Sequence, residues 1–192
     1  MAKKKPDYRK TPIIPWHIGE SEEEFQQVQE ELIAQTDRGA GVMGGSFLEW
    51  RVKQAIRTRL HTWDEETEHI FGTDTRAGEL GFTDQCRMAY SLGLIGVVGL
   101  KDLMTIGKIR NRFAHQLSVK SFTDRQIADW CKSLRSPELW YEAYGRIESA
   151  KPSNRPRLRY IAAVQQLQMM IWSVAVSGRV RWPKRRPGFL YW

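Results

Sequence analysis

Apolar residues recur at spacings of three and four along most of this chain, which is the period of amphipathic α-helices. The first such stripe, Phe25, Val28 and Leu32, follows Ser21 and a run of three glutamates, an arrangement typical of a helix start. We expect this helix to run to about Asp37. Similar stripes along the chain predict helices that begin near Glu22, Phe47, Phe82, Leu100, Thr123 and Arg157.

Glycines suggest where these helices stop. Residues 38–45 read RGAGVMGG, which predicts a break, after which Ser46 caps a second helix. The polar residues 64–78 predict a loop, and Gly96 and Gly99 predict the end of a third helix that runs from Phe82 through Leu94. Residues 97–100, VVGL, also fit a short strand.

The C-terminal half continues the helical pattern. Ser136 followed by Pro137 predicts a short helix, residues 149–156 predict a linker, and a last helix is expected from Arg157 to Gly178. Taken together, the segments predict an all-α fold, a helical bundle of about five to seven helices.

Length and composition favour one ordinary domain, because 192 residues with 41% hydrophobic content can bury a core without disulfides. Cys86 and Cys131 lie in predicted helices without a CxxC spacing, so we expect buried, reduced thiols. The most apolar stretch, residues 161–176, contains three glutamines, and the N-terminus lacks a signal-peptide core. A cytoplasmic protein without a membrane span is therefore expected.

The net charge of +8 is carried by the two ends. Residues 1–15 have a net charge of +4 and residues 179–192 have +5, so the remainder is nearly neutral. We therefore divide the chain into a basic, proline-rich arm (1–20), a helical domain (21–178) and a basic, aromatic tail (179–192).

The tail fits two kinds of ligand. Its basic and aromatic residues suit phosphate contact with base stacking, and they equally suit docking on a protein. We favour docking, on the body of the chain or on a partner, because terminal aromatic side chains are costly to leave in water. The predicted binding residues are Arg179, Arg181, Trp182, Lys184, Arg185 and Arg186.

Two segments carry a family resemblance. Residues 88–95 read MAYSLGLI and residues 109–127 read IRNRFAHQLSVKSFTDRQI. Together they resemble the mannitol operon repressor family of bacterial regulators, over roughly residues 46–134. The resemblance implies an all-helical regulator that acts through protein partners, and we expect it to be a homodimer. We find no helix-turn-helix pattern that would read DNA.

Arg110, Asn111 and His115 also match the R-N-x-x-x-H signature of the HEPN superfamily, which implies a metal-independent ribonuclease as the alternative function. Histidine titrates near neutral pH, so His115 suits a general base, and the Arg110 guanidinium suits the phosphate. These two residues are five positions apart, about 140° around a helix, so they converge only if Arg110 reaches across or the helix ends first. We expect them to line a cleft or a dimer interface.

A structural role competes with catalysis for these residues. Arg, Asn and His are common at helix C-termini, and we favour the interpretation that Arg110, Asn111 and His115 cap a helix whose Phe113 lies in the core. Glu49 is a minor catalytic candidate that would bind Arg110 or tune His115. The remaining histidines lack the spacing of metal ligands, so neither a metal nor a cofactor is predicted.

Overall fold

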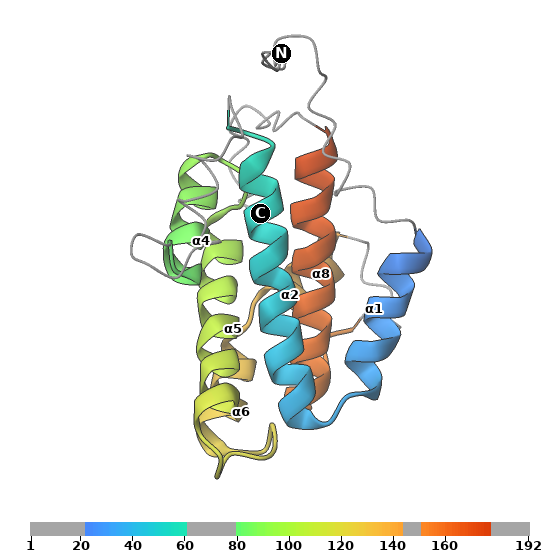
Figure 1. Ribbon diagram of the computed structural model, residues 1–192. Helices are drawn as coiled ribbons and strands as arrows, with labels where there is room; N and C mark the ends of the chain where they lie inside the picture. Colours follow the sequence, from blue (N-terminus) through green and yellow to red (C-terminus); the bar gives the residue numbers. More distant parts are fainter. Residues whose placement is uncertain (1–21, 61–79, 144–150, 178–192) are drawn as a thin grey trace, which may run out of the picture.

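The computed structural model describes residues 22–60, 80–143 and 151–177, and all regular structure in these ranges is helical (Figure 1). The predicted all-α bundle is therefore confirmed. The helices of the described part are α1 (Glu22–Ala34), α2 (Asp37–Arg57), α4 (Phe82–Ser91), α5 (Val97–His115), α6 (Arg125–Ser133), α7 (Ser136–Ala143) and α8 (Pro156–Ser177). None of them is long and apolar enough to cross a membrane.

Helix α2 occupies the centre of the bundle, between α5 and α8, with α4 beside α5 and α1 beside α8 (Figure 1). Short helices α6 and α7 pack against α8. Most of the predicted stripe residues that lie in the described ranges are buried, because none of these helices can remove its apolar face from water alone. The core includes Leu48, Val52, Ile56, Ile106, Ile109, Phe113, Tyr160, Val164 and Leu167.

The predicted break at residues 38–45 is wrong, because the four glycines of this segment lie inside α2. The helix begins at Asp37, after Thr36, whose Oγ1 accepts a hydrogen bond from Gly39 N at 3.1 Å. A Cβ atom on Gly41 would lie 2.2 Å from Cδ2 of Phe113. These glycines therefore let neighbouring helices approach α2 closely, and that packing outweighs the low helix propensity of glycine.

Three other boundaries differ from the prediction. Helix α1 ends at Ala34, before Asp37, and α4 ends at Ser91, before Leu94. Residues 97–100 form the first turn of α5 and not a strand, with Gly99 inside that helix. A Cβ on Gly99 would stand 3.2 Å from Cε of Met170, so α8 packs closely on α5 at this position.

Candidate functional site

Arg110 on α5 stands at the centre of a polar cluster between α2 and α5. Its Nη1 forms an ion pair with Oε2 of Glu49, and its Nε donates a hydrogen bond to Oδ1 of Asn111 at 3.2 Å. The guanidinium also lies over the ring of Phe82, 5.3 Å from the centroid. A Cβ on Gly45 would stand only 2.6 Å from Cβ of Arg110, so this glycine permits the approach of Arg110 to α2.

The environment of Arg110 limits its chemistry. Its side chain is 18% exposed and that of Glu49 is 33% exposed, so the pair lies at the edge of the buried region. A bound phosphate would have to compete with the Glu49 carboxylate for the guanidinium. The sequence suggested that Glu49 contacts Arg110 or His115. The structure shows the contact with Arg110.

His115 is not part of this cluster. It is the last residue of α5, it is exposed, and its imidazole forms no hydrogen bond or ion pair within the described ranges. The helix continues through His115, so a bend that would bring it to Arg110 is absent from α5. Because Arg110 points toward Glu49, Arg110 and His115 of a single chain do not form one site.

The end of α5 is held by Arg38, which the sequence did not single out. Its guanidinium donates hydrogen bonds to the carbonyl oxygens of Ala114 at 3.2 Å and Gln116 at 3.5 Å. Carbonyls at a helix C-terminus lack partners within the helix and favour a cation nearby. Arg38 therefore binds the terminal carbonyls of α5, a role that we expected of Arg110, Asn111 and His115, and only the tertiary contact of α2 with α5 reveals it.

Arg112, within the same motif, joins α5 to α6. Its Nε lies 3.2 Å from Oδ1 of Asp124, and its Nη2 lies 3.4 Å from Oδ2. Asp124 also caps α6 by accepting a hydrogen bond from Ile127 N at 3.3 Å. Desolvation acts to raise the pKa of Asp124, but the hydrogen bonds from Arg112 and Ile127 outweigh it and hold that pKa below its ordinary value.

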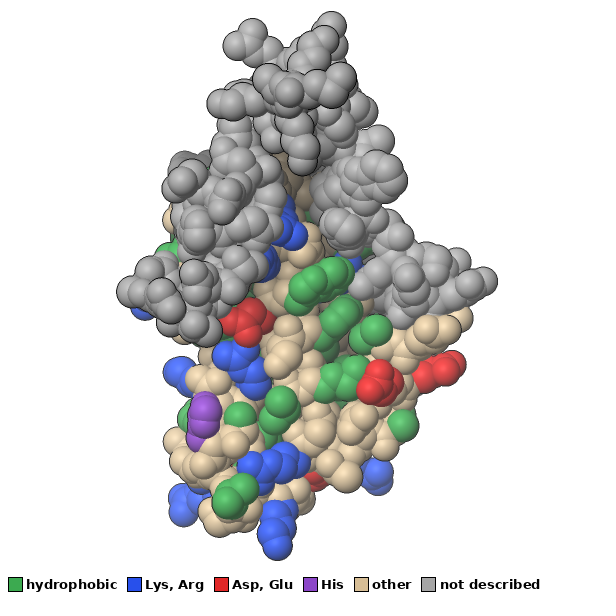
Figure 2. Space-filling view, in the orientation of Figure 1, with side chains coloured by type: hydrophobic (Ala, Val, Ile, Leu, Met, Phe, Trp, Pro, Cys, Tyr) green, Lys and Arg blue, Asp and Glu red, His purple; other side chains and the backbone are tan. Residues whose placement is uncertain are grey.

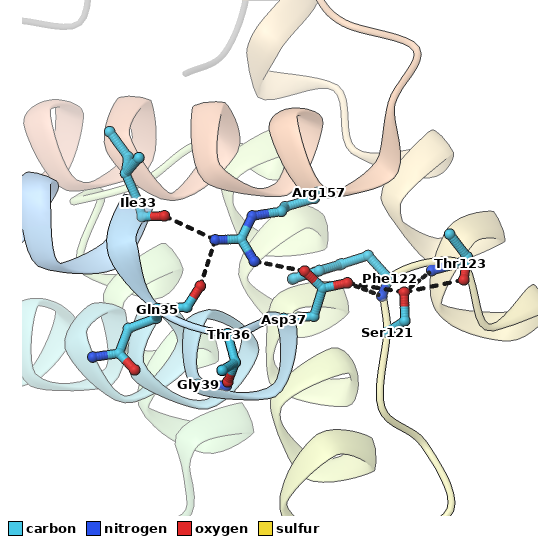
Figure 3. Close-up of polar contacts among 9 residues, drawn as sticks. All are labelled: Ile33, Gln35, Thr36, Asp37, Gly39, Ser121, Phe122, Thr123 and Arg157. Atoms are coloured by element: carbon cyan, nitrogen blue, oxygen red, sulfur yellow. Dashed lines mark hydrogen bonds and ion pairs between the residues drawn. The ribbon is translucent and has the colours of Figure 1, made fainter.

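Asp37 joins three segments at the same end of the bundle (Figure 3). Its Oδ2 accepts hydrogen bonds from Ser121 Oγ and Phe122 N, both at 2.9 Å, and its Oδ1 accepts one from Arg157 Nη1 at 2.6 Å. The carboxylate thereby fixes the turn between α5 and α6 to the first turns of α2 and α8. The sequence predicted none of these contacts, because the partners lie 84 to 120 positions from Asp37.

Several predicted residues lie outside the described ranges. They include the basic tail with Arg179, Arg181, Trp182, Lys184, Arg185 and Arg186, and the histidines His17, His61 and His69. Within residues 22–60, 80–143 and 151–177, no group of three His, Cys, Asp or Glu side chains is placed to hold a metal ion.

The helical bundle has a fold that is known from a solved structure. No protein-family model and no curated protein matches the sequence. The structural match is to the MtlR chain of the X-ray structure of the MtlR–HPr complex from Escherichia coli, with a TM-score of 0.56 and 17% sequence identity. It covers 77% of this chain and 97% of that chain. At this identity the match establishes a shared fold.

Proposed function

We propose that this chain is a mannitol repressor-like regulator, with a role in transcriptional regulation, that acts by binding a protein partner. The observation that carries the proposal is the fold match, which spans nearly the whole MtlR chain, taken from a complex with HPr. The motif residues support a scaffold role, since Arg110 contacts α2, Arg112 contacts α6 and Phe113 is buried in the core.

A titration with HPr tests this proposal. The full chain is titrated calorimetrically with the HPr of the organism that encodes it. The Escherichia coli MtlR–HPr pair serves as the positive control under identical conditions. Saturable binding is the expected result. Absence of binding to HPr, by calorimetry at two temperatures, while the control pair binds, would remove HPr as the partner of this chain.

A metal-independent ribonuclease is the second candidate function. Asn111 and His115 are both exposed and four positions apart on α5, so they share a face beside the Glu49–Arg110 pair. The full chain is incubated with mixed RNA in the presence of a chelator. Cleavage that disappears in His115→Ala and Arg110→Ala, and is kept in Lys108→Ala on the same helix, would establish the enzyme and overturn the purely regulatory function.

The homodimer remains a prediction that concerns this same face. In a homodimer, His115 of one copy would face a group supplied by the other copy, because Arg110 of its own chain is bound by Glu49. Sedimentation velocity of the full chain measures the oligomeric state directly. A monomer at all concentrations would remove the composite site and most of the support for catalysis.

A further inference from the structure

Four basic residues and one leucine lie at the end of the bundle where α5 ends and where α2 and α8 begin. We call this surface the basic end: Arg38, Leu117, Lys120, Arg125 and Arg155. Hydrogen bonds join the segments that carry these residues. Arg38 binds the α5 terminus next to Leu117, and Asp37 binds both Ser121, which follows Lys120, and Arg157, which lies two positions after Arg155. Arg125 begins α6, directly after this turn. Figure 2 shows Lys and Arg side chains gathered there, with few acidic ones on this face.

Carboxylates of the described residues leave the positive charge of the basic end unpaired. Two carboxylates at this end, Asp37 and Asp124, are already paired with Arg157 and Arg112. None of the four cations of the basic end forms an ion pair with a carboxylate of the described ranges. The N-terminus of α8 adds to the positive potential, since its first turn contains no acidic residue.

Leu117 is held outward from this end, with 80% of its surface exposed. On one side, Arg38 binds the carbonyls of Ala114 and Gln116. On the other side, Val119 is buried and its N–H donates to Gln116 O at 3.1 Å. The turn is therefore fixed before any partner binds, which reduces the entropy cost when a partner covers Leu117.

From this geometry we infer that the basic end docks an acidic protein segment, whose carboxylates contact the four cations and whose apolar side chains cover Leu117. The inference rests on the proposed function, in that the chain binds a protein, but it does not require that protein to be HPr. An apolar contact inside a charged rim is the usual anatomy of a specific interface, and opposite charges accelerate and orient the encounter. A nucleic acid would satisfy the cations through its phosphates but would leave Leu117 uncovered, so the protein partner is favoured.

The test uses the full chain and a short fluorescent peptide in which Asp and Glu flank Leu and Phe, followed by anisotropy. Leu117→Ser and Lys120→Glu remove the apolar contact and reverse one charge. Lys101→Glu, an exposed residue near the start of α5 at the opposite end, changes the net charge equally and is the matched control. We expect each of the first two variants to weaken binding about tenfold and the control to leave it unchanged.

Parallel titrations with single-stranded RNA and with HPr separate the possible outcomes. Failure of the peptide to bind, or equal binding by all variants, would overturn the inference. So would RNA binding that weakens in Lys120→Glu but not in Leu117→Ser, since that pattern indicates a phosphate contact. HPr binding that persists in both variants retains the proposed function and shows that HPr contacts another surface, so the peptide titration alone decides the role of the basic end. If the peptide binds with the expected variant effects but HPr does not bind, the inference about the basic end stands and HPr is excluded as the partner.

Discussion

Asp37 and Arg157 form an ion pair, with 2.6 Å between Oδ1 and Nη1, that joins the first turn of α2 to the first turn of α8. The same guanidinium donates through Nη2 to the carbonyl oxygens of Ile33 at 2.9 Å and Gln35 at 2.6 Å (Figure 3). The pair therefore ties together the connection between α1 and α2, the start of α8 and, through Phe122, the turn before α6.

Asp37→Asn is expected to lower the free energy of unfolding by about 1.5–3 kcal/mol, the range for hydrogen bonds to charged groups. The amide keeps an acceptor oxygen but removes the charge and introduces donors that face other donors. Urea denaturation near neutral pH measures the decrease. Asp84→Asn is the control, because Asp84 is half-exposed in a surface pair with Arg87, and its change should stay within about 0.5 kcal/mol.

The effect of Asp37→Asn should also depend on pH. Desolvation acts to raise the pKa of Asp37, but the hydrogen bonds from Phe122, Arg157 and Ser121 outweigh it and hold that pKa below its ordinary value of 3.8. The stabilisation is therefore complete above the unfolded-state pKa and is lost as the pH falls through the folded-state pKa. The difference between wild type and variant should shrink below about pH 4. A difference that grows on acidification would contradict this assignment.

Gly41→Ala is expected to destabilise the protein, although alanine favours a helix interior over glycine by about 1 kcal/mol. The added methyl would stand 2.2 Å from Phe113, which is fully buried, so packing must shift at a typical cost of about 1–3 kcal/mol. Gly81→Ala has no atom within 4 Å of the new methyl and is the control. Thermal denaturation distinguishes them, and a higher melting temperature for Gly41→Ala would contradict the packing explanation.

Both cysteines are expected to resist alkylation in the folded state. Burial raises the pKa of Cys86 to about 12, an effect that the Glu49 carboxylate reinforces, and burial likewise raises the pKa of Cys131 to about 12. The thiolate is the reactive form, so little of it exists near pH 8. Iodoacetamide followed by mass spectrometry should modify neither thiol in buffer and both in urea. Rapid labelling of the native protein would show that the bundle opens readily there.

The tail prediction concerns nucleic acid and lies outside the described ranges. If the chain binds RNA or DNA, the five basic residues of segment 179–192 should supply much of the attraction, because residues 16–178 are nearly neutral. Deleting this segment should reduce the slope of log affinity against log salt by about 0.7–0.9 for each phosphate that its cations neutralise. An unchanged slope would place the binding surface on the bundle.

Local sequence patterns were enough to predict much of the fold. The apolar stripe through Leu48, Val52 and Ile56 is buried as expected, and α7 begins at Ser136 before its proline. These features are encoded within a few turns of one helix, by residue spacing and by capping groups. The candidate site could be predicted only in part. The sequence pattern indicated Glu49 and Arg110 as possible partners, but it did not determine where His115 would lie.

The all-helical class, most helix positions and the buried faces of α2, α5, α6 and α8 follow from the sequence alone. The continuation of a helix through residues 38–45 does not, because the cost of glycine there is local whereas the close packing of Phe113 on Gly41 comes from a distant segment. The folded structure likewise assigns the cap of α5 to Arg38 and the joining of three segments to Asp37. Those roles depend on contacts between residues far apart in the chain, and such contacts leave no periodic pattern in the sequence.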